Sequence, residues 1–109
     1  GCPVAERVEA PANAAQKRRL AALTPRQVVA RQLAGEPIEQ VVNRVGASAL
    51  PLGGIKVMAR NGWFAARPSG TEDLYKIYAE SFLGPSHLAC ILEEGQALVD
   101  SALAERDST

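Results

Sequence analysis

The chain has 109 residues, the size of one domain with a single hydrophobic core. Apolar residues make up 47% and charged residues 22%, a globular composition that excludes a disordered tail, a collagen-like repeat and a disulfide-stabilised miniprotein. The 12 basic and 12 acidic residues cancel, so the chain lacks the basic excess of a dedicated nucleic-acid or membrane-surface binder.

The two cysteines, Cys2 and Cys90, form no CxxC pair, and His87 is the only histidine, so we predict no zinc site. We interpret both cysteines as reduced thiols of a cytosolic protein. No apolar run reaches the roughly 18 residues of a membrane helix, and no signal peptide is present, so we expect a soluble, cytoplasmic chain. The first residue is not methionine, and the single methionine is Met58, which indicates a piece of a longer protein.

The first predicted element is a helix. Residues 1–12 lack a clear period and are interpreted as a linker or frayed terminus. Asn13 and Gln16 have the spacing of a capping box, and helix formers continue to Leu23. We expect residues 17–19, a basic triplet, to face water.

The next segments are less periodic. Thr24–Gln27 has the residues of a second helix start and predicts a short turn. Val28–Leu33 is ambiguous, but its β-branched residues favour a strand by residue 33. Ile38–Val45 has apolar residues at helical spacing and predicts a short helix, followed by a loop over residues 46–54.

The second half has the clearest signals. Ile55–Ala59 and Trp63–Arg67 predict two strands joined at Asn61-Gly62, a dipeptide typical of a type I′ hairpin turn. A third strand is predicted over Leu74–Phe82. Apolar residues at helical spacing after Gly84-Pro85 predict a long final helix.

These elements predict an α+β fold. Three antiparallel strands, with a fourth from around residue 30, would form a four-stranded sheet with helices packed on one face. The other face must then meet solvent or another domain. On the third strand, Tyr78 lies between Lys76 and Glu80 on that half-exposed face.

The loop between the last two predicted strands concentrates residues that bind oxyanions. Arg67 offers a planar fork of donors that fits two phosphate oxygens, and Ser69 and Thr71 offer hydroxyls. Gly70 allows a positive φ, which would let successive backbone N–H groups point inward, and Pro68 stiffens the loop. These residues together favour a phosphate dianion as ligand.

The residue types also allow a structural interpretation, in which Arg67 pairs with Glu72 or Asp73 and the loop is ordinary turn chemistry. The loop is not a Walker loop, because it lacks the GK[ST] sequence and precedes a strand. On residue types alone both interpretations stay open.

Other candidates are weaker. His87 has no constellation of Asp, Cys or Ser nearby, Cys90 has no activator, and the adjacent Glu72 and Asp73 are poorly placed for acid–base partnership. No carboxylate cluster indicates magnesium. The aromatic residues are interpreted as core and sheet packing rather than as a stacking platform: Trp63, Phe64, Tyr75 and Tyr78.

The segment Gly62–Phe82, with Ala66-Arg67-Pro68-Ser69-Gly70-Thr71-Glu72-Asp73 at its centre, resembles the C-terminal domain of bacterial phosphoglucomutases of the α-D-phosphohexomutase superfamily. The upstream segments 33–38 and 53–57 fit as well, so the resemblance runs from about residue 13 to 105. Gly70 and Asp73 favour the phosphoglucomutase branch over the phosphomannomutase branch.

The resemblance implies a four-domain enzyme that interconverts glucose 1-phosphate and glucose 6-phosphate through a phosphoserine and glucose 1,6-bisphosphate, with magnesium in another domain. It implies a TATA-binding-protein-like fold, with residues 13–109 as the C-terminal phosphate-binding domain. Arg67, Ser69, Gly70 and Thr71 would bind the phosphate of a phosphosugar.

The phosphoserine and metal-loop segments are missing, so we expect no catalytic residue, no metal and no cofactor on this chain, which would be inactive alone. Its partners would be the substrate and the other three domains, with no nucleic acid and no membrane. Two further hypotheses stay open: a stand-alone anion- or nucleic-acid-binding module, and a structural or dimerising domain.

Overall fold

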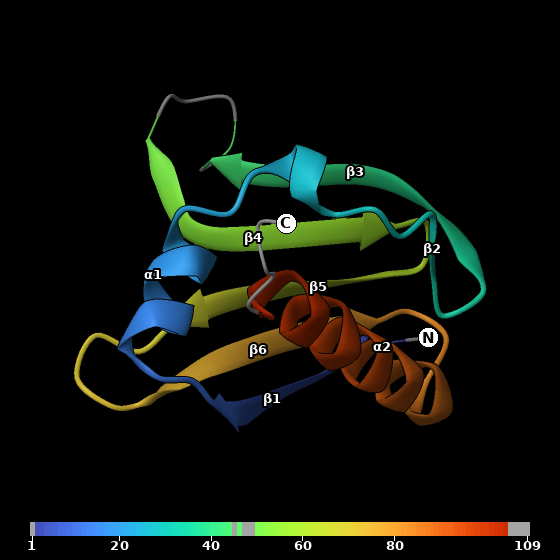
Figure 1. Cartoon of the computed structure of the whole chain (residues 1–109). Coiled ribbons are helices and arrows are strands. Elements are labelled where there is room, and N and C mark those ends of the chain that lie inside the picture. Colours follow the sequence, from blue (N-terminus) through green and yellow to red (C-terminus); the bar gives the residue numbers. More distant parts are fainter. Residues whose placement is uncertain (1, 45, 47–49, 105–109) are drawn as a thin grey trace.

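The computed structural model describes residues 2–44, 46 and 50–104. Its elements follow in chain order: β1 (Val4–Pro11), α1 (Ala14–Ala21), a 3-10 turn η1 (Pro25–Gln27), β2 (Gln32–Leu33), β3 (Glu36–Arg44), β4 (Pro51–Ala59), β5 (Gly62–Pro68), β6 (Leu74–Ser81) and α2 (Pro85–Leu103). In the described residues the strands form one antiparallel sheet of order β1-β6-β5-β4-β3-β2 (Figure 1).

Both helices pack on one face of this sheet, called here the inner face (Figure 1). Alternate residues of β4, β5 and β6 point into the core between sheet and helices. The largest buried apolar side chains of the sheet are Leu33, Ile55, Val57, Phe64, Tyr75 and Ile77, and they form one core with Leu20, Leu23, Ile91 and Val99. The opposite face, called the outer face, carries the remaining alternate residues. The α+β class and the arrangement of helices on one face are therefore confirmed, but the sheet has six strands where four were expected.

The expected linker over residues 1–12 is wrong for residues 4–11, which form edge strand β1 along β6. Val4, Val8 and Ala10 lie opposite inner-face residues of β6 and pack on the core. Three of the other five positions carry charged residues, Glu6, Arg7 and Glu9, as is common on an edge strand, and they hide the apolar alternation.

The helix predicted over Ile38–Val45 is also wrong, because residues 36–44 form strand β3 against β4. A β-bulge between Ile38 and Gln40 shifts the register by one residue. Ile38 and Val41, three residues apart, consequently both face the core, which imitates helical spacing. Val45 and residues 47–49 of the predicted loop lie outside the described residues, and β4 begins at Pro51, within the range predicted as loop.

The hairpin between β4 and β5 is confirmed, but its turn differs from the prediction. Arg60 and Asn61 are the central residues, and neither has a positive φ. The turn with two left-handed residues joins β2 to β3, where Ala34 has φ 51° and Gly35 has φ 82°. Gly62 belongs to the strand, and a Cβ there would overlap Ile91 and come within 2.8 Å of the Glu80 carbonyl oxygen.

The predicted helix starts are confirmed. Asn13 accepts a hydrogen bond from the Gln16 backbone N–H, and the Gln16 side chain accepts one from the Asn13 N–H, both at 2.8 Å. The Gln27 side chain accepts from the Thr24 N–H at 2.8 Å in the same way. No helix among the described residues is long and apolar enough to cross a membrane.

Candidate functional site

The candidate site lies at the end of the sheet where β5 turns into β6. The residues between these strands, 69–73, are called here the β5–β6 loop. The Ser69 N–H donates to the Leu74 carbonyl at 3.0 Å and closes the loop. The Ser69 Oγ accepts the N–H groups of Thr71 at 3.3 Å and Glu72 at 3.1 Å, so this side chain shapes the turn.

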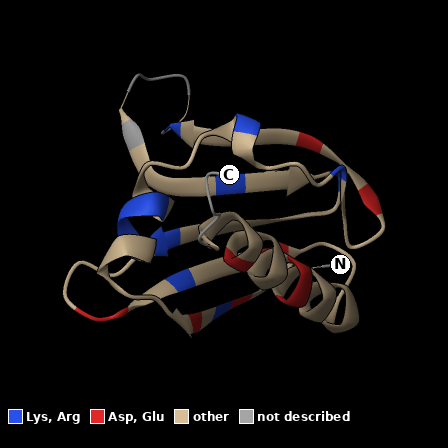
Figure 2. Cartoon of the chain, in the orientation of Figure 1, with Lys and Arg blue, Asp and Glu red and all other residues tan. Residues whose placement is uncertain are grey.

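Arg67 lies on the outer face at the end of β5, directly opposite Lys76 of β6. Its side chain is exposed and forms no ion pair with any carboxylate of the described residues. The pairing of Arg67 with Glu72 or Asp73 is therefore wrong, but the turn chemistry of the structural interpretation is present at Ser69. Figure 2 shows basic segments on α1, β5 and β6 near this loop.

The β4 backbone makes room for Arg67. A Cβ built on Gly53 would lie 3.8 Å from Arg67 Nη2 and 3.9 Å from its Nε, so the guanidinium lies beside the Gly53 Cα. Gly53 has φ 82°, a conformation that glycine adopts readily. The neighbouring Gly54 lies against the backbone of Ala66 and Arg67.

The four predicted residues line one open cavity of about 300 Å³. This cavity, called here the loop cavity, is lined by Arg67, Pro68, Ser69, Gly70, Thr71, Glu72, Lys76 and Tyr78. Lys76 and Tyr78 were not predicted as site residues. The alternation of β6 carries the signal that could have found them, since it places both on the same face as Arg67.

Several hydrogen-bond donors at the loop cavity have no partner in the described part of the chain. The Gly70 N–H and the Thr71 hydroxyl form no hydrogen bond there. The Ser69 oxygen accepts two bonds, so its O–H remains able to donate. The positive φ expected for Gly70 is wrong, because the left-handed glycines of the described residues are Gly35, Gly46, Gly53 and Gly84. Nothing lies within 4 Å of a Cβ built on Gly70, so the space beside this residue is open.

The loop also contacts α1. Lys17 was expected to face water, but its ammonium group donates to the carbonyl oxygens of Ser69 at 3.3 Å and Glu72 at 2.8 Å. It also lies 3.8 Å from Asp73 Oδ1. Arg19 differs from the expectation as well, since its Nη1 donates to the Leu103 carbonyl at 3.0 Å.

His87 is surrounded by polar groups that were not predicted from the sequence to lie near it. Its Nδ1 lies 2.7 Å from Ser81 Oγ, and its Nε2 lies 3.5 Å from Glu36 Oε1. Glu36 also accepts the Asn61 backbone N–H at 3.1 Å. Ser81 is fully buried, and this network connects α2, β6, β3 and the β4–β5 turn.

The remaining candidates have structural surroundings. The Cys90 thiol donates to Glu94 Oε2 at 3.0 Å, and this hydrogen bond, ahead of burial and nearby acidic charge, raises the pKa of Cys90 above its usual value. A raised pKa argues against a nucleophilic thiolate. Phe64 and Tyr75 are core residues, as predicted. Trp63 lies on the outer face, where its Nε1 donates to Glu80 and the Lys56 ammonium lies 4.3 Å from its ring centroid.

The sequence of the chain matches a known protein family. Residues 4–95 match the family described as phosphoglucomutase/phosphomannomutase, C-terminal domain. The chain belongs to this family. The match begins with β1, so the edge strand is part of the family domain.

A phosphoglucomutase of Komagataeibacter xylinus is 46% identical to this chain over 105 residues, which cover 96% of the chain and 19% of that relative. The chain therefore spans about a fifth of the length of the relative. The described residues hold no group of three or more His, Cys, Asp or Glu that could bind a metal ion, so no step involving magnesium is assigned to them.

Proposed function

We propose that this chain is the substrate-phosphate-binding C-terminal domain of a cytoplasmic phosphoglucomutase, which interconverts glucose 1-phosphate and glucose 6-phosphate. Family membership supports the enzyme, and the unpaired Arg67 beside the donor groups of the β5–β6 loop supports the role of the domain. The phosphoserine, the magnesium ion and the sugar-binding groups would lie in the other three domains, so the chain alone would be inactive.

In this proposal the loop cavity binds the phosphate group that does not react. Arg67 would make a bidentate contact with two phosphate oxygens, and the hydroxyls of Ser69 and Thr71 and the Gly70 N–H would donate to the others. Lys76, opposite Arg67, would add a second positive charge, while Glu72 would keep the net charge of the cavity low.

The hydrogen-bond donors of the loop cavity would recognise the phosphate group rather than the sugar. The Arg67 guanidinium and the Gly70 N–H can only donate hydrogen bonds, and the hydroxyls of Ser69 and Thr71 are able to donate, which suits a dianion. A sugar that turns over between two phosphoryl transfers presents its phosphate once from C1 and once from C6. A site that recognises phosphate alone accepts both orientations. Glucose 1,6-bisphosphate, the intermediate implied for the enzyme, would use the same contacts.

The direct test is a titration of the 109-residue chain with glucose 6-phosphate, followed by amide chemical shifts. We expect saturable shifts confined to residues 67–76, with a Kd of about 1 mM, equivalent to about 4 kcal/mol. Glucose should cause no such shifts, because it lacks the phosphate.

Arg67→Ala should abolish these shifts without lowering the melting temperature, since the side chain is exposed and unpaired among the described residues. Arg60→Ala is the matched control, because Arg60 is exposed at the opposite end of β5. Equal binding by wild type and Arg67→Ala, or no shifts at about 30 mM ligand, would refute the proposed role.

The activity can be tested in a chimera in which this chain replaces the matching segment of the Komagataeibacter xylinus phosphoglucomutase. Arg67→Ala in an active chimera should lower kcat/KM, and Arg60→Ala should not. An unchanged kcat/KM for Arg67→Ala would exclude Arg67 from substrate binding.

A further inference from the structure

One lysine outside the loop cavity holds three groups of the β5–β6 loop. Lys17, at the fourth position of α1, lies 52 residues before Ser69 in the sequence. Its ammonium group has three partners: the carbonyl oxygens of Ser69 and Glu72, at 3.3 and 2.8 Å, and the Asp73 carboxylate, at 3.8 Å. The two carbonyl contacts are hydrogen bonds, whereas the Asp73 contact is an ion pair beyond hydrogen-bond distance.

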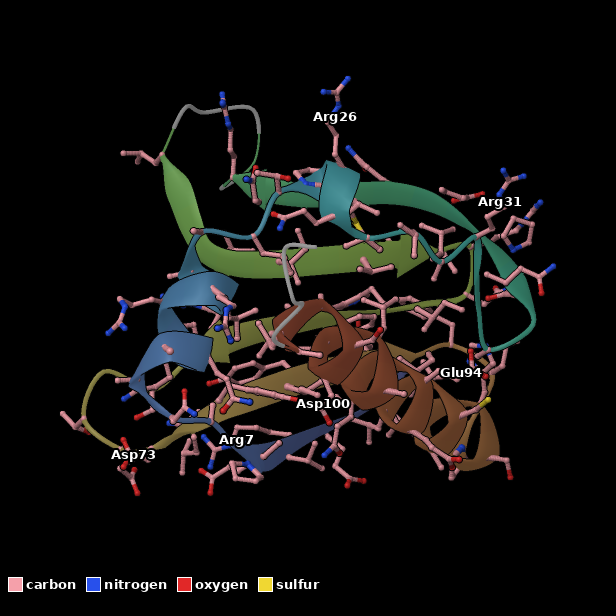
Figure 3. All side chains as sticks on the ribbon, viewed as in Figure 1. Arg7, Arg26, Arg31, Asp73, Glu94 and Asp100 are labelled. Carbon is pink, nitrogen blue, oxygen red and sulfur yellow. The ribbon has the colours of Figure 1, made fainter. Side chains whose placement is uncertain are left out.

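The two carbonyl contacts are the important ones. The Asp73 side chain is 87% exposed and projects from the loop toward solvent (Figure 3), so its ion pair with Lys17 is weak. The Lys17 side chain is only 18% exposed, and hydrogen bonds from a charged donor are stronger than neutral ones.

These contacts fix which polar groups of the loop face a ligand. Lys17 does not line the loop cavity, and it holds the Ser69 and Glu72 carbonyl oxygens to itself. A carbonyl oxygen turned toward the cavity would repel an anion, whereas the Gly70 N–H and the hydroxyls of Ser69 and Thr71 attract one. We infer that Lys17 is a positioning residue for phosphate: it holds the β5–β6 loop in its anion-binding conformation without touching the anion. This inference rests on the proposed phosphate-binding function.

The expected loss of phosphate affinity without Lys17 depends on how many molecules keep the loop in its binding conformation. The apparent Kd equals the intrinsic Kd divided by the fraction of molecules with the loop in its binding conformation. If that fraction falls to about one tenth without Lys17, phosphate binding weakens about tenfold.

The test compares three variants of the 109-residue chain by amide titration with inorganic phosphate and glucose 6-phosphate. Lys17→Gln removes the ammonium group and should weaken binding of both ligands about tenfold. Lys17→Arg keeps a charged donor and should restore most of the affinity. Arg18→Gln is the matched control, because it removes the same charge from the next, exposed residue of α1.

A second readout follows the loop itself. Backbone ¹⁵N relaxation should show larger ps–ns motion at Gly70 and Thr71 in Lys17→Gln, but not in Arg18→Gln. The melting temperature of Lys17→Gln should fall below that of Arg18→Gln, because Lys17→Gln loses two hydrogen bonds from a charged donor. A merely stabilising role of Lys17 would lower the melting temperature and leave phosphate binding unchanged.

The outcomes separate this inference from the proposed function. If wild type binds phosphate and Arg67→Ala does not, but Lys17→Gln binds like wild type, the positioning role is overturned and the phosphate site stands. Equal losses in Lys17→Gln and Arg18→Gln would show a general charge effect and would also overturn the positioning role. If wild type binds neither ligand, both the phosphate site and the positioning role fail.

Discussion

Adding one methyl group at Gly54 should separate β4 from β5 beside Arg67. A Cβ at this buried position would overlap the Ala66 carbonyl oxygen and lie 3.0 Å from the Ala66 carbonyl carbon and 3.1 Å from the Arg67 Cα. All three atoms are backbone, so no side chain can turn away to relieve the overlap. The strands themselves must move.

The cost of Gly54→Ala can be assembled from two terms. Overpacking a tight site costs about 1–3 kcal/mol, and each hydrogen bond lost from the sheet costs about 1 kcal/mol. We expect the free energy of unfolding to fall by about 3 kcal/mol, which for a domain of this size lowers the melting temperature by about 12–24 °C. Most domains have 5–15 kcal/mol of stability, so the variant should still fold.

Gly70→Ala is the matched control. The chemical change is identical, but nothing lies within 4 Å of the added Cβ, and the φ of Gly70 is not left-handed. Its melting temperature should equal that of the wild type. Because Gly70 lines the loop cavity, the methyl group should still weaken phosphate binding, by about tenfold.

Thermal and urea unfolding followed by circular dichroism, together with the phosphate titration, measure both quantities. Gly54→Ala should lose stability and phosphate affinity, and Gly70→Ala should lose affinity alone. A Gly54→Ala chain with wild-type stability would refute the argument that backbone contact at β5 requires glycine here. A Gly70→Ala chain with wild-type affinity would exclude close approach of the phosphate to that residue.

Two further predictions follow from perturbed side chains. Burial, followed by the hydrogen bond to Asp100, raises the pKa of Tyr75 far above its usual value, so the folded state keeps a proton that the unfolded state loses above about pH 10. The free energy of unfolding should therefore fall by up to about 1.4 kcal/mol per pH unit above pH 10. Urea unfolding of Tyr75→Phe should not show this slope. Equal slopes in the wild type and the variant would contradict Tyr75 as its cause. Cys90, whose thiol donates to Glu94, should react with a neutral thiol reagent more slowly than exposed Cys2, and Glu94→Gln should accelerate it; equal rates for the two cysteines would exclude the effect.

Elements with local signals could be predicted from the sequence. The capping boxes at Asn13 and Thr24 involve partners three residues away, and they form as expected. The alternation in β6 and the helical period of α2 are equally local and were correct. In each case the residues that decide the structure are near neighbours in the chain.

Elements that depend on a partner strand were predicted poorly. The apolar pattern of β3 has helical spacing because a bulge places Ile38 and Val41 on the same face, and only pairing with β4 reveals the bulge. The turn with two left-handed residues formed at Ala34-Gly35, where the N–H of Ala34 donates to Glu94 Oε1 at 2.8 Å. Glu94 lies 60 residues away on α2, so no local pattern contains this contact.

The candidate site divides in the same way. Arg67, Ser69, Gly70 and Thr71 come from one short segment, so their place around one cavity could be predicted, whereas Lys17 joins the loop only through the packing of α1. Arg67 and Lys76 share an outer-face register pair, although like charges directly opposite each other weaken a sheet.

The repulsion between Arg67 and Lys76 is not relieved by a neighbouring carboxylate of the described residues. Glu9 of β1 lies opposite Lys76 on the other side, yet neither cation forms an ion pair within the described residues. Two unpaired cations directly opposite each other depart from the usual charge pairing across a sheet, and such departures are typical of functional sites. A bound phosphate dianion would remove the repulsion between Arg67 and Lys76. In the proposed function, the pair of cations that costs stability without a ligand would therefore contribute binding energy to the phosphate.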